Sequence, residues 1–151
     1  MSVNAAMEKI GDAERRWLKD GQKNLGFVAD IDAAHLDDIV SHMTLSRYDA
    51  GARVCVEGES GDAFYVIYEG GVEVTKNGWK APVGRLIPGE FFGEMALLFR
   101  QPRSATVTTT KPSRLFALKA DDFARMLKLN PALAEVMRVI AEERQRELAR
   151  S

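Results

Sequence analysis

Glu94 and Arg103 stand close together in a stretch that otherwise holds glycines and small apolar residues. Gly93 frees the backbone directly before Glu94 and a short apolar run that favours a helical turn. The first N–H groups of such a turn have no intrahelical acceptor, so the amides of Gly93, Met95 and Ala96 can face an anion. The arginine guanidinium suits two phosphate oxygens, whereas a carboxylate only accepts hydrogen bonds and therefore suits a sugar hydroxyl. The stretch predicts a site for a ribose phosphate.

Two short motifs in this stretch carry a resemblance to a known family. Residues 92–97 read Phe-Gly-Glu-Met-Ala-Leu and residues 102–107 read Pro-Arg-Ser-Ala-Thr-Val. In this order they resemble the phosphate-binding cassette of the cyclic-nucleotide-binding domain family. That family includes regulatory subunits of cAMP-dependent protein kinase, cGMP-dependent kinases, cyclic-nucleotide-gated channels and bacterial catabolite activators. The resemblance runs from about Lys23 to Leu148.

The resemblance implies a role for each residue of the cassette. Glu94 is expected to accept the ribose 2′-hydroxyl, and Arg103 to hold the exocyclic oxygens of the cyclic phosphate. The Ser104 hydroxyl adds a further donor, and Leu86 and Val107 supply apolar contacts to the base. The full set of expected ligand-binding residues is Leu86, Gly93, Glu94, Met95, Ala96, Arg103, Ser104 and Val107.

The identity of the base depends on fewer residues. A serine or threonine after the arginine occurs in both cAMP-binding and cGMP-preferring relatives, so Ser104 leaves the choice open. Leu148 and Ala149 stand about where catabolite activators present a polar pair to adenine. We therefore expect an apolar cap on the base, or one supplied by Arg138 or another helix residue, and a ligand that is cAMP in preference to cGMP.

Alternating apolar residues and closely spaced glycines predict the scaffold that positions these residues. Strands are expected within residues 53–56, 63–68, 72–75, 82–86, 104–110 and 114–119, and Asn77-Gly78 indicates a hairpin. Many short strands at this spacing are typical of an antiparallel jelly-roll β-barrel, here about residues 44–119. The predicted fold class is mainly β with flanking helices: N-terminal helices precede the barrel, and a C-terminal lid helix follows it.

Helical periodicity appears on both sides of the predicted barrel. The spacing predicts a helix over residues 5–20 and a second from Asp32, as its N-cap, to Met43, with residues 24–28 as a connector. After the barrel, helices are expected over residues 121–129 and 131–149, with Asn130 as the cap between them and Pro131 opening the last one. We divide the chain into an N-terminal helical extension, residues 1–22, and a cyclic-nucleotide-binding domain, residues 23–151, whose C-terminal helices span about residues 120–149.

Composition narrows the remaining classes of function. The chain has 151 residues, a net charge of −1 and a single cysteine, Cys55. We expect no general attraction to nucleic acid, no internal disulfide, no membrane segment and a location in the cytosol or on the cytosolic face of a membrane parent. His35 and His42 are not spaced as a metal pair, and we expect no metal and no cofactor.

The prediction is a non-catalytic sensor, in which ligand binding moves the C-terminal helix and informs an effector domain, such as a kinase or a channel pore, in a longer parent chain. A DNA-binding regulator is the first alternative and needs a helix-turn-helix after the long helix. A metal-dependent cupin enzyme needs clustered histidines on strands, and both histidines precede the barrel. A degenerate interaction module is the last alternative, and the presence of Glu94 and Arg103 argues against it.

Overall fold

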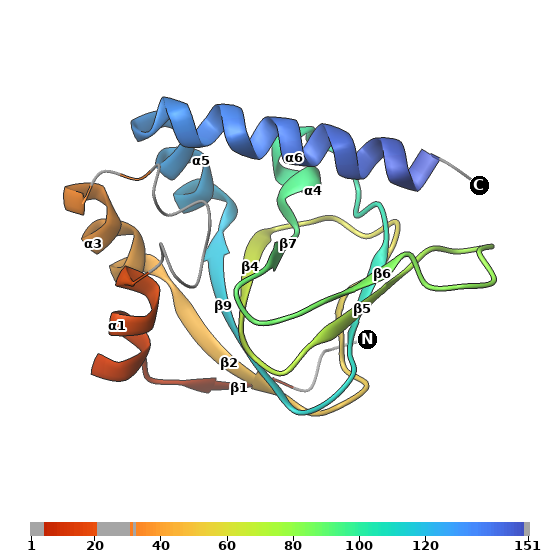
Figure 1. The fold of residues 1–151 in the computed structure, drawn as a ribbon, viewed down its shortest axis with the longest axis horizontal. Coiled ribbons are helices and arrows are strands. Elements are labelled where there is room, and N and C mark those ends of the chain that lie inside the picture. The colour runs from red at the N-terminus through yellow and green to blue at the C-terminus, as the bar shows by residue number, and fades with distance from the viewer. Residues whose placement is uncertain (1–4, 21–30, 32, 150–151) are drawn as a thin grey trace.

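The fold consists of two antiparallel sheets, with helices at one end and across one face (Figure 1). The computed structural model describes residues 5–20, 31 and 33–149. One sheet has the strand order β1-β2-β9-β4-β7, and the other has the order β3-β8-β5-β6. The strands are β1 (Ala5–Glu8), β2 (Thr44–Tyr48), β3 (Arg53–Cys55), β4 (Ala63–Glu69), β5 (Val72–Thr75), β6 (Gly84–Leu86), β7 (Phe91–Phe92), β8 (Thr106–Thr109) and β9 (Ser113–Lys119).

The predicted class, mainly β with flanking helices, is confirmed, but the barrel is not closed. β9 lies at the centre of the first sheet, where Phe116 pairs with Leu45 of β2 on one side and Val66 of β4 on the other. All three side chains are fully buried. Within the described residues no ladder joins the edges of the two sheets, and the edge strands β6 and β7 span only three and two residues. The sheets form an open jelly roll.

The expected helix over residues 5–20 is wrong in its first part. Residues Ala5–Glu8 form β1, which pairs antiparallel with β2 from Ala5 opposite Tyr48 to Glu8 opposite Leu45. Glu8 also accepts hydrogen bonds from Arg47 and Arg114, which lie on the same sheet. Pairing with a strand that is distant in the sequence satisfies the backbone and overrides the weak local preference for helix. The helix begins only after Gly11.

The remaining helices follow the predicted ranges closely. The predicted connector at residues 24–28 and the predicted cap Asp32 lie outside the described residues. None of the described helices combines the length and the apolar composition needed to cross a lipid bilayer. The helices are α1 (Asp12–Lys19), α3 (Ala33–His42), α4 (Glu94–Leu98), α5 (Ala120–Leu129) and α6 (Pro131–Ala149).

Asn130 lies between α5 and α6 and contacts α3. Its side-chain nitrogen donates to the carbonyl oxygen of Met126 at 2.8 Å, so it closes the end of α5. Its side-chain oxygen lies 3.2 Å from Nδ1 of His35 on α3. Asn130 thus lies between the two helices and its side chain caps the end of α5, whereas its predicted role as the cap that begins α6 stays a prediction.

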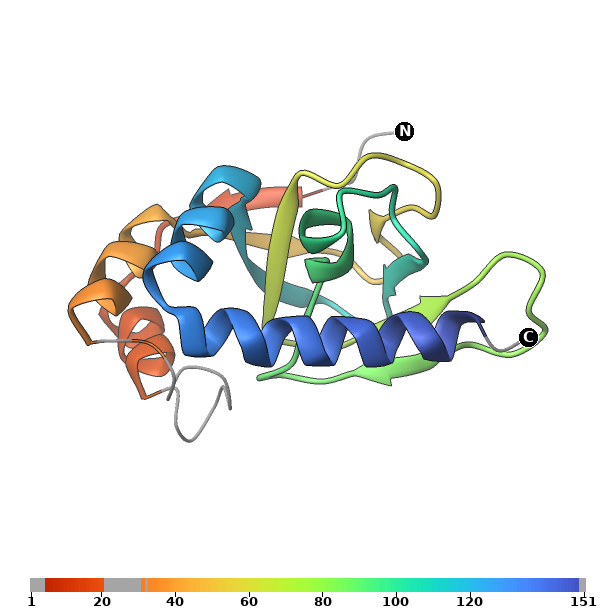
Figure 2. The same cartoon turned by 90° about the horizontal axis from the view of Figure 1, so that it is seen from above.

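The apolar stripe of α6 packs into the main core. Leu133, Met137 and Ala141 are fully buried, and Leu133 and Met137 belong to the same cluster as Phe64 and Phe123. The second half of α6 passes alongside α4, which it contacts, and continues above the β5–β6 hairpin (Figures 1 and 2). The core thus fixes the start of α6 and places its charged end over the second sheet.

The predicted hairpin joins β5 to β6, with Val72 opposite Leu86 and Val74 opposite Gly84. Its loop is longer than a two-residue turn, because the backbone N–H of Trp79 donates to Lys76 and the strands resume only near Val83. Gly78 has a φ of 85° in this turn. That left-handed conformation is the one a glycine adopts without a steric cost. The projecting hairpin forms one wall of a cavity that also faces α4 and the end of α6.

Candidate ligand-binding site

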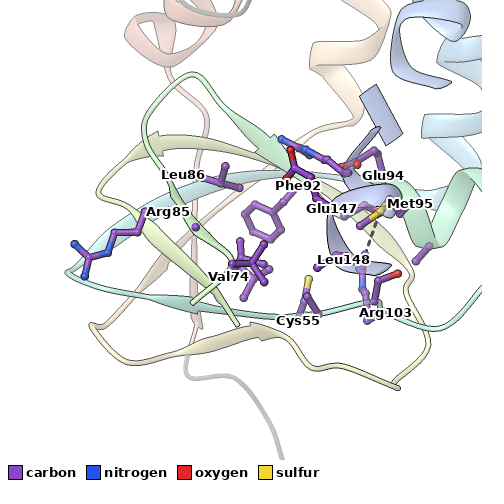
Figure 3. Close-up of a pocket in the computed structure, with 18 residues that line it drawn as sticks. Cys55, Val74, Arg85, Leu86, Phe92, Glu94, Met95, Arg103, Glu147 and Leu148 are labelled. Atoms are coloured by element: carbon purple, nitrogen blue, oxygen red, sulfur yellow. Dashed lines mark hydrogen bonds and ion pairs between the residues drawn. The ribbon is translucent and has the colours of Figure 1, made fainter. Parts of the chain in front are cut away.

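A cavity of about 250 Å³ lies between the second sheet, α4 and the end of α6. All eight residues expected to bind ligand line it, although they come from β6, α4, β8 and the segment before β8. Figure 3 shows Phe92, Val74 and Cys55 on one side and Glu94, Met95, Glu147 and Leu148 on another. Arg85, by contrast, extends away from the other labelled residues. The fold therefore gathers the predicted residues around one space, which is the candidate site.

Glu94 begins the short helix α4 at the floor of this cavity. Gly93 precedes it with a φ of 94°, a conformation that turns the chain sharply from β7 into α4. The Glu94 side chain is only 1% exposed. Its Oε1 accepts a hydrogen bond from Arg144 Nη1 at 2.8 Å, while its Oε2 has no hydrogen-bond partner among the described residues. Burial raises the pKa of the Glu94 carboxyl, and the Arg144 charge opposes that rise.

Arg103 is held in place by the backbone around it. Its Nη1 donates to the carbonyl oxygen of Gly93 at 3.0 Å, and its Nη2 donates to that of Ala63 at 2.9 Å. The residue is 7% exposed, yet its side chain still lines the cavity. A Cβ on Gly61 would lie 2.8 Å from both Cζ and Nε of this guanidinium. Gly61, whose importance the sequence alone did not indicate, therefore leaves the space that Arg103 occupies.

The remaining wall of the cavity is apolar. Phe92 stacks on Tyr65 with ring centroids 5.0 Å apart, and Val107 and Cys55 are buried beside it. Leu86 packs against the same cluster from β6. Burial raises the pKa of the Cys55 thiol to about 11, so the thiol stays protonated and is a packing group. One side of the cavity thus offers charge and the other an apolar surface, as a nucleotide requires.

Three α6 residues, Arg144, Glu147 and Leu148, complete the cavity. Arg144 also places its guanidinium 4.8 Å from the centre of the Phe91 ring. It was missed as a site residue because it lies in the charged run of residues 142–147, which resembles a solvated helix end.

The helical spacing of the sequence could nevertheless have identified Arg144 as a residue that faces the domain. Arg144 and Leu148 continue at helical spacing the buried stripe Leu133, Met137 and Ala141. Arg138, considered for the cap, lies on the exposed side of α6 and pairs with Glu135 and Glu142.

No metal centre competes for this site within the described residues, which contain no group of three or more His, Cys, Asp or Glu side chains able to hold an ion. His42 instead lies beside Arg125, with Arg125 Nη2 3.1 Å from its Nδ1. The groups that the cavity offers to a ligand are the buried Glu94 carboxylate, the buried Arg103 guanidinium and the apolar wall.

An open jelly roll, a carboxylate after a left-handed glycine and an arginine on the following segment are the features expected of a cyclic nucleotide-binding domain. The family profile described as "Cyclic nucleotide-binding domain" matches residues 45–130, which is more than half of the chain. The chain therefore belongs to the cyclic nucleotide-binding domain family.

Curated relatives come from two kinds of protein. A cAMP-dependent protein kinase regulatory subunit from Yarrowia lipolytica is 37% identical over 118 residues, covering 78% of this chain and 32% of the relative. A cyclic nucleotide-gated potassium channel from Mesorhizobium japonicum is 42% identical over 112 residues, covering 74% of this chain and 30% of the relative. The chain thus spans about a third of the length of these curated relatives.

Solved structures show the same fold. The regulatory domain of Toxoplasma gondii PKA, crystallised with cAMP, matches with a TM-score of 0.76 at 24% identity, covering 85% of this chain and 50% of that one. The catabolite activator protein of Thermus thermophilus matches with a TM-score of 0.70 at 27% identity, covering 80% of this chain and 58% of that one. The first likeness is one of fold alone.

Proposed function

We propose that this chain is a non-catalytic sensor that binds cAMP in preference to cGMP. Arg103 holds the exocyclic phosphate oxygens, and Glu94 accepts the ribose 2′-hydroxyl. The amides of Gly93, Met95 and Ala96 and the hydroxyl of Ser104 surround the phosphate. Leu86 and Val107 contact the base. The membership of the family supports a cyclic nucleotide as the ligand, and the 37% identity to a cAMP-dependent protein kinase regulatory subunit supports the choice of base.

The unpartnered Oε2 of Glu94 is the observation that carries this proposal. A buried carboxylate oxygen without a donor is unfavourable by roughly 1–3 kcal/mol or more. This oxygen belongs to a residue that lines the same cavity as Arg103, and it has no partner among the described residues. A ribose hydroxyl supplies the missing donor, whereas a deoxyribose at the same place does not.

The same carboxylate links the ligand to α6. One oxygen of Glu94 binds Arg144, and the other is left for the ribose. The end of α6 lines the cavity through Arg144, Glu147 and Leu148, so a bound nucleotide is expected to contact this part of the helix and to shift it. In this proposal, the shift of α6 reports occupancy to an effector domain, such as a kinase or a channel pore, in a longer parent chain.

Calorimetric titration with four ligands tests the proposal. We expect cAMP to bind more tightly than cGMP, and 2′-deoxy-cAMP and linear 5′-AMP to bind at least tenfold more weakly than cAMP. Glu94→Ala and Arg103→Ala should each weaken cAMP binding strongly, with thermal unfolding confirming that the variants are folded. Undiminished cAMP binding by both variants would contradict the roles proposed for Glu94 and Arg103. In a separate test, an unchanged amount of cAMP after prolonged incubation with the protein would support the absence of catalysis.

A further inference from the structure

Ser104 is held by a side chain that the proposed ligand does not contact. Gln101, three residues earlier, donates from Nε2 to the Ser104 Oγ at 2.8 Å. Gln101 is itself anchored, because its backbone N–H donates to the carbonyl oxygen of Ala96 at 3.2 Å. Ser104 lines the ligand cavity, whereas Gln101 lines a separate groove and not this cavity. Gln101 therefore holds Ser104 from outside the cavity.

The direction of this hydrogen bond determines what Ser104 can offer. A serine hydroxyl has one hydrogen to donate and two lone pairs that accept. The Gln101 amide occupies one lone pair, and the described residues provide no acceptor for the hydroxyl hydrogen. That hydrogen remains available at the cavity, in the residue adjacent to Arg103. A phosphate oxygen is always an acceptor and is therefore its natural partner.

The backbone of Ser104 is fixed as well. Lys76 Nζ donates to the Ser104 carbonyl oxygen and to Glu57 Oε2, each at 3.0 Å. Glu57 Oε1 in turn accepts the backbone N–H of Asn77 at 2.8 Å. The Lys76 and Glu57 side chains are 25% and 18% exposed, so this pair is only partly shielded from solvent. The β5–β6 hairpin thus holds the main chain of Ser104 while Gln101 holds its hydroxyl.

We propose that Gln101 is a positioning residue that holds the Ser104 hydroxyl with its hydrogen directed at the phosphate of a bound cyclic nucleotide. This inference rests on the proposed function and adds a residue outside the cavity to it. It also assigns Ser104 to the phosphate, so Ser104 does not discriminate between adenine and guanine. The choice of base then falls to the residues near the end of α6 and on the apolar wall.

The test is a double-mutant cycle with Gln101→Met, Ser104→Ala and the double variant. Methionine keeps the length of glutamine and removes the amide donor. The matched control is Gln145→Met, on an exposed position of α6. The ligands are cAMP, cGMP and the two phosphorothioate diastereomers of cAMP, in which sulfur replaces one or the other exocyclic oxygen. Dissociation constants come from calorimetry, and thermal unfolding confirms that each variant is folded.

We expect Gln101→Met to weaken cAMP binding about threefold to tenfold, the effect of one net hydrogen bond, and to have no further effect once Ser104 is alanine. It should also reduce the discrimination between the two diastereomers and leave the cAMP-to-cGMP ratio unchanged, whereas Gln145→Met changes neither. Additive effects of the two substitutions, or a change in the cAMP-to-cGMP ratio, would overturn the role of Gln101. Absence of any cyclic-nucleotide binding by the wild-type chain is a different result, because it contradicts the proposed function itself.

Discussion

Arg144 of α6 donates a hydrogen bond from Nη1 to Oε1 of Glu94 at the start of α4, across 2.8 Å. The Glu94 side chain is 1% exposed, whereas the Arg144 side chain is 27% exposed. The contact joins the C-terminal helix to the one buried carboxylate of the cavity. The other oxygen of this carboxylate is unpartnered among the described residues. Under the proposed function it binds the ribose, so the pair would connect ligand binding to the position of α6.

Removing Arg144 should therefore loosen α6 and destabilise the fold. We expect Arg144→Met to lower the free energy of unfolding by about 2–3 kcal/mol, less than the ~3–5 kcal/mol of a fully buried pair because Arg144 is partly exposed. Hydrogen exchange should increase in the second half of α6. Adding Glu94→Gln should recover part of the loss, since the uncompensated charge disappears. Urea denaturation measures these changes, with Arg138→Met as the control on an exposed pair. Equal effects at Arg138 and Arg144 would contradict this reasoning.

The Glu94 carboxyl should also give the stability a characteristic pH dependence. Burial raises its pKa in the folded chain above the ordinary value of 4.5. The folded state then binds this proton more tightly than the unfolded state, so its contribution to stability is greatest below pH 4.5 and is lost as the pH rises through the folded pKa. We expect the difference in unfolding free energy between wild type and Glu94→Gln to change over this window.

Urea denaturation at a series of pH values measures this difference. Glu143→Gln, on an exposed position of α6, controls for the loss of one carboxylate. If the difference in unfolding free energy between wild type and Glu94→Gln does not change with pH, Glu94 has the same pKa in the folded and unfolded states, which contradicts this prediction.

The elements that local signals specify were predicted from the sequence. Alternation of apolar residues located β4, β5 and β9, and Pro131 located the start of α6. Seven of the eight expected ligand-binding residues could be named because they lie in two short contiguous motifs, and Leu86 came from the family resemblance; the fold brings all eight to one cavity. Their binding roles stay a prediction until ligand is measured.

Features that depend on distant partners could not be predicted in the same way. Residues 5–8 have no strong strand signal, and they form β1 only because β2 offers its edge. Gly61 looks like any turn glycine until the Arg103 guanidinium is found beside it. Arg144 carries a charge typical of a solvated helix face, and only its contact with Glu94 distinguishes it from Arg138.

Cys55 provides a probe of the cavity that needs no label on the ligand. The residue is 4% exposed, and burial raises the pKa of its thiol to about 11. Because the thiolate is the reactive form, we expect alkylation by iodoacetamide at pH 8 to be much slower in the folded chain than in urea. Saturating cAMP should slow it further, since Cys55 lines the cavity. Cys55→Ser is the blank, and rapid modification of the folded chain would contradict the burial of this thiol.

Gly61 tests whether the position of Arg103 depends on a missing side chain. A Cβ at Gly61 would lie 2.7 Å from the Ala96 Cβ and 2.8 Å from Arg103 Cζ and Nε, so Gly61→Ala must displace the guanidinium or α4. We expect cAMP affinity to fall at least tenfold and the free energy of unfolding to fall by about 1–3 kcal/mol, as for other overpacked sites. Gly71→Ala is the matched control, because its Cβ would meet only ordinary contacts of 3.4–3.9 Å.

Comparing these two alanine variants distinguishes a steric clash of the new methyl group from strain in the backbone. Neither glycine has a positive φ, so alanine is compatible with the backbone at both positions. A greater loss at Gly61 must therefore come from the atoms that the new methyl group meets, and those atoms belong to Arg103 and α4. Calorimetry with cAMP and urea denaturation measure the two effects. Equal cAMP affinity for wild type and Gly61→Ala would mean that the guanidinium position seen here is not the one that binds phosphate.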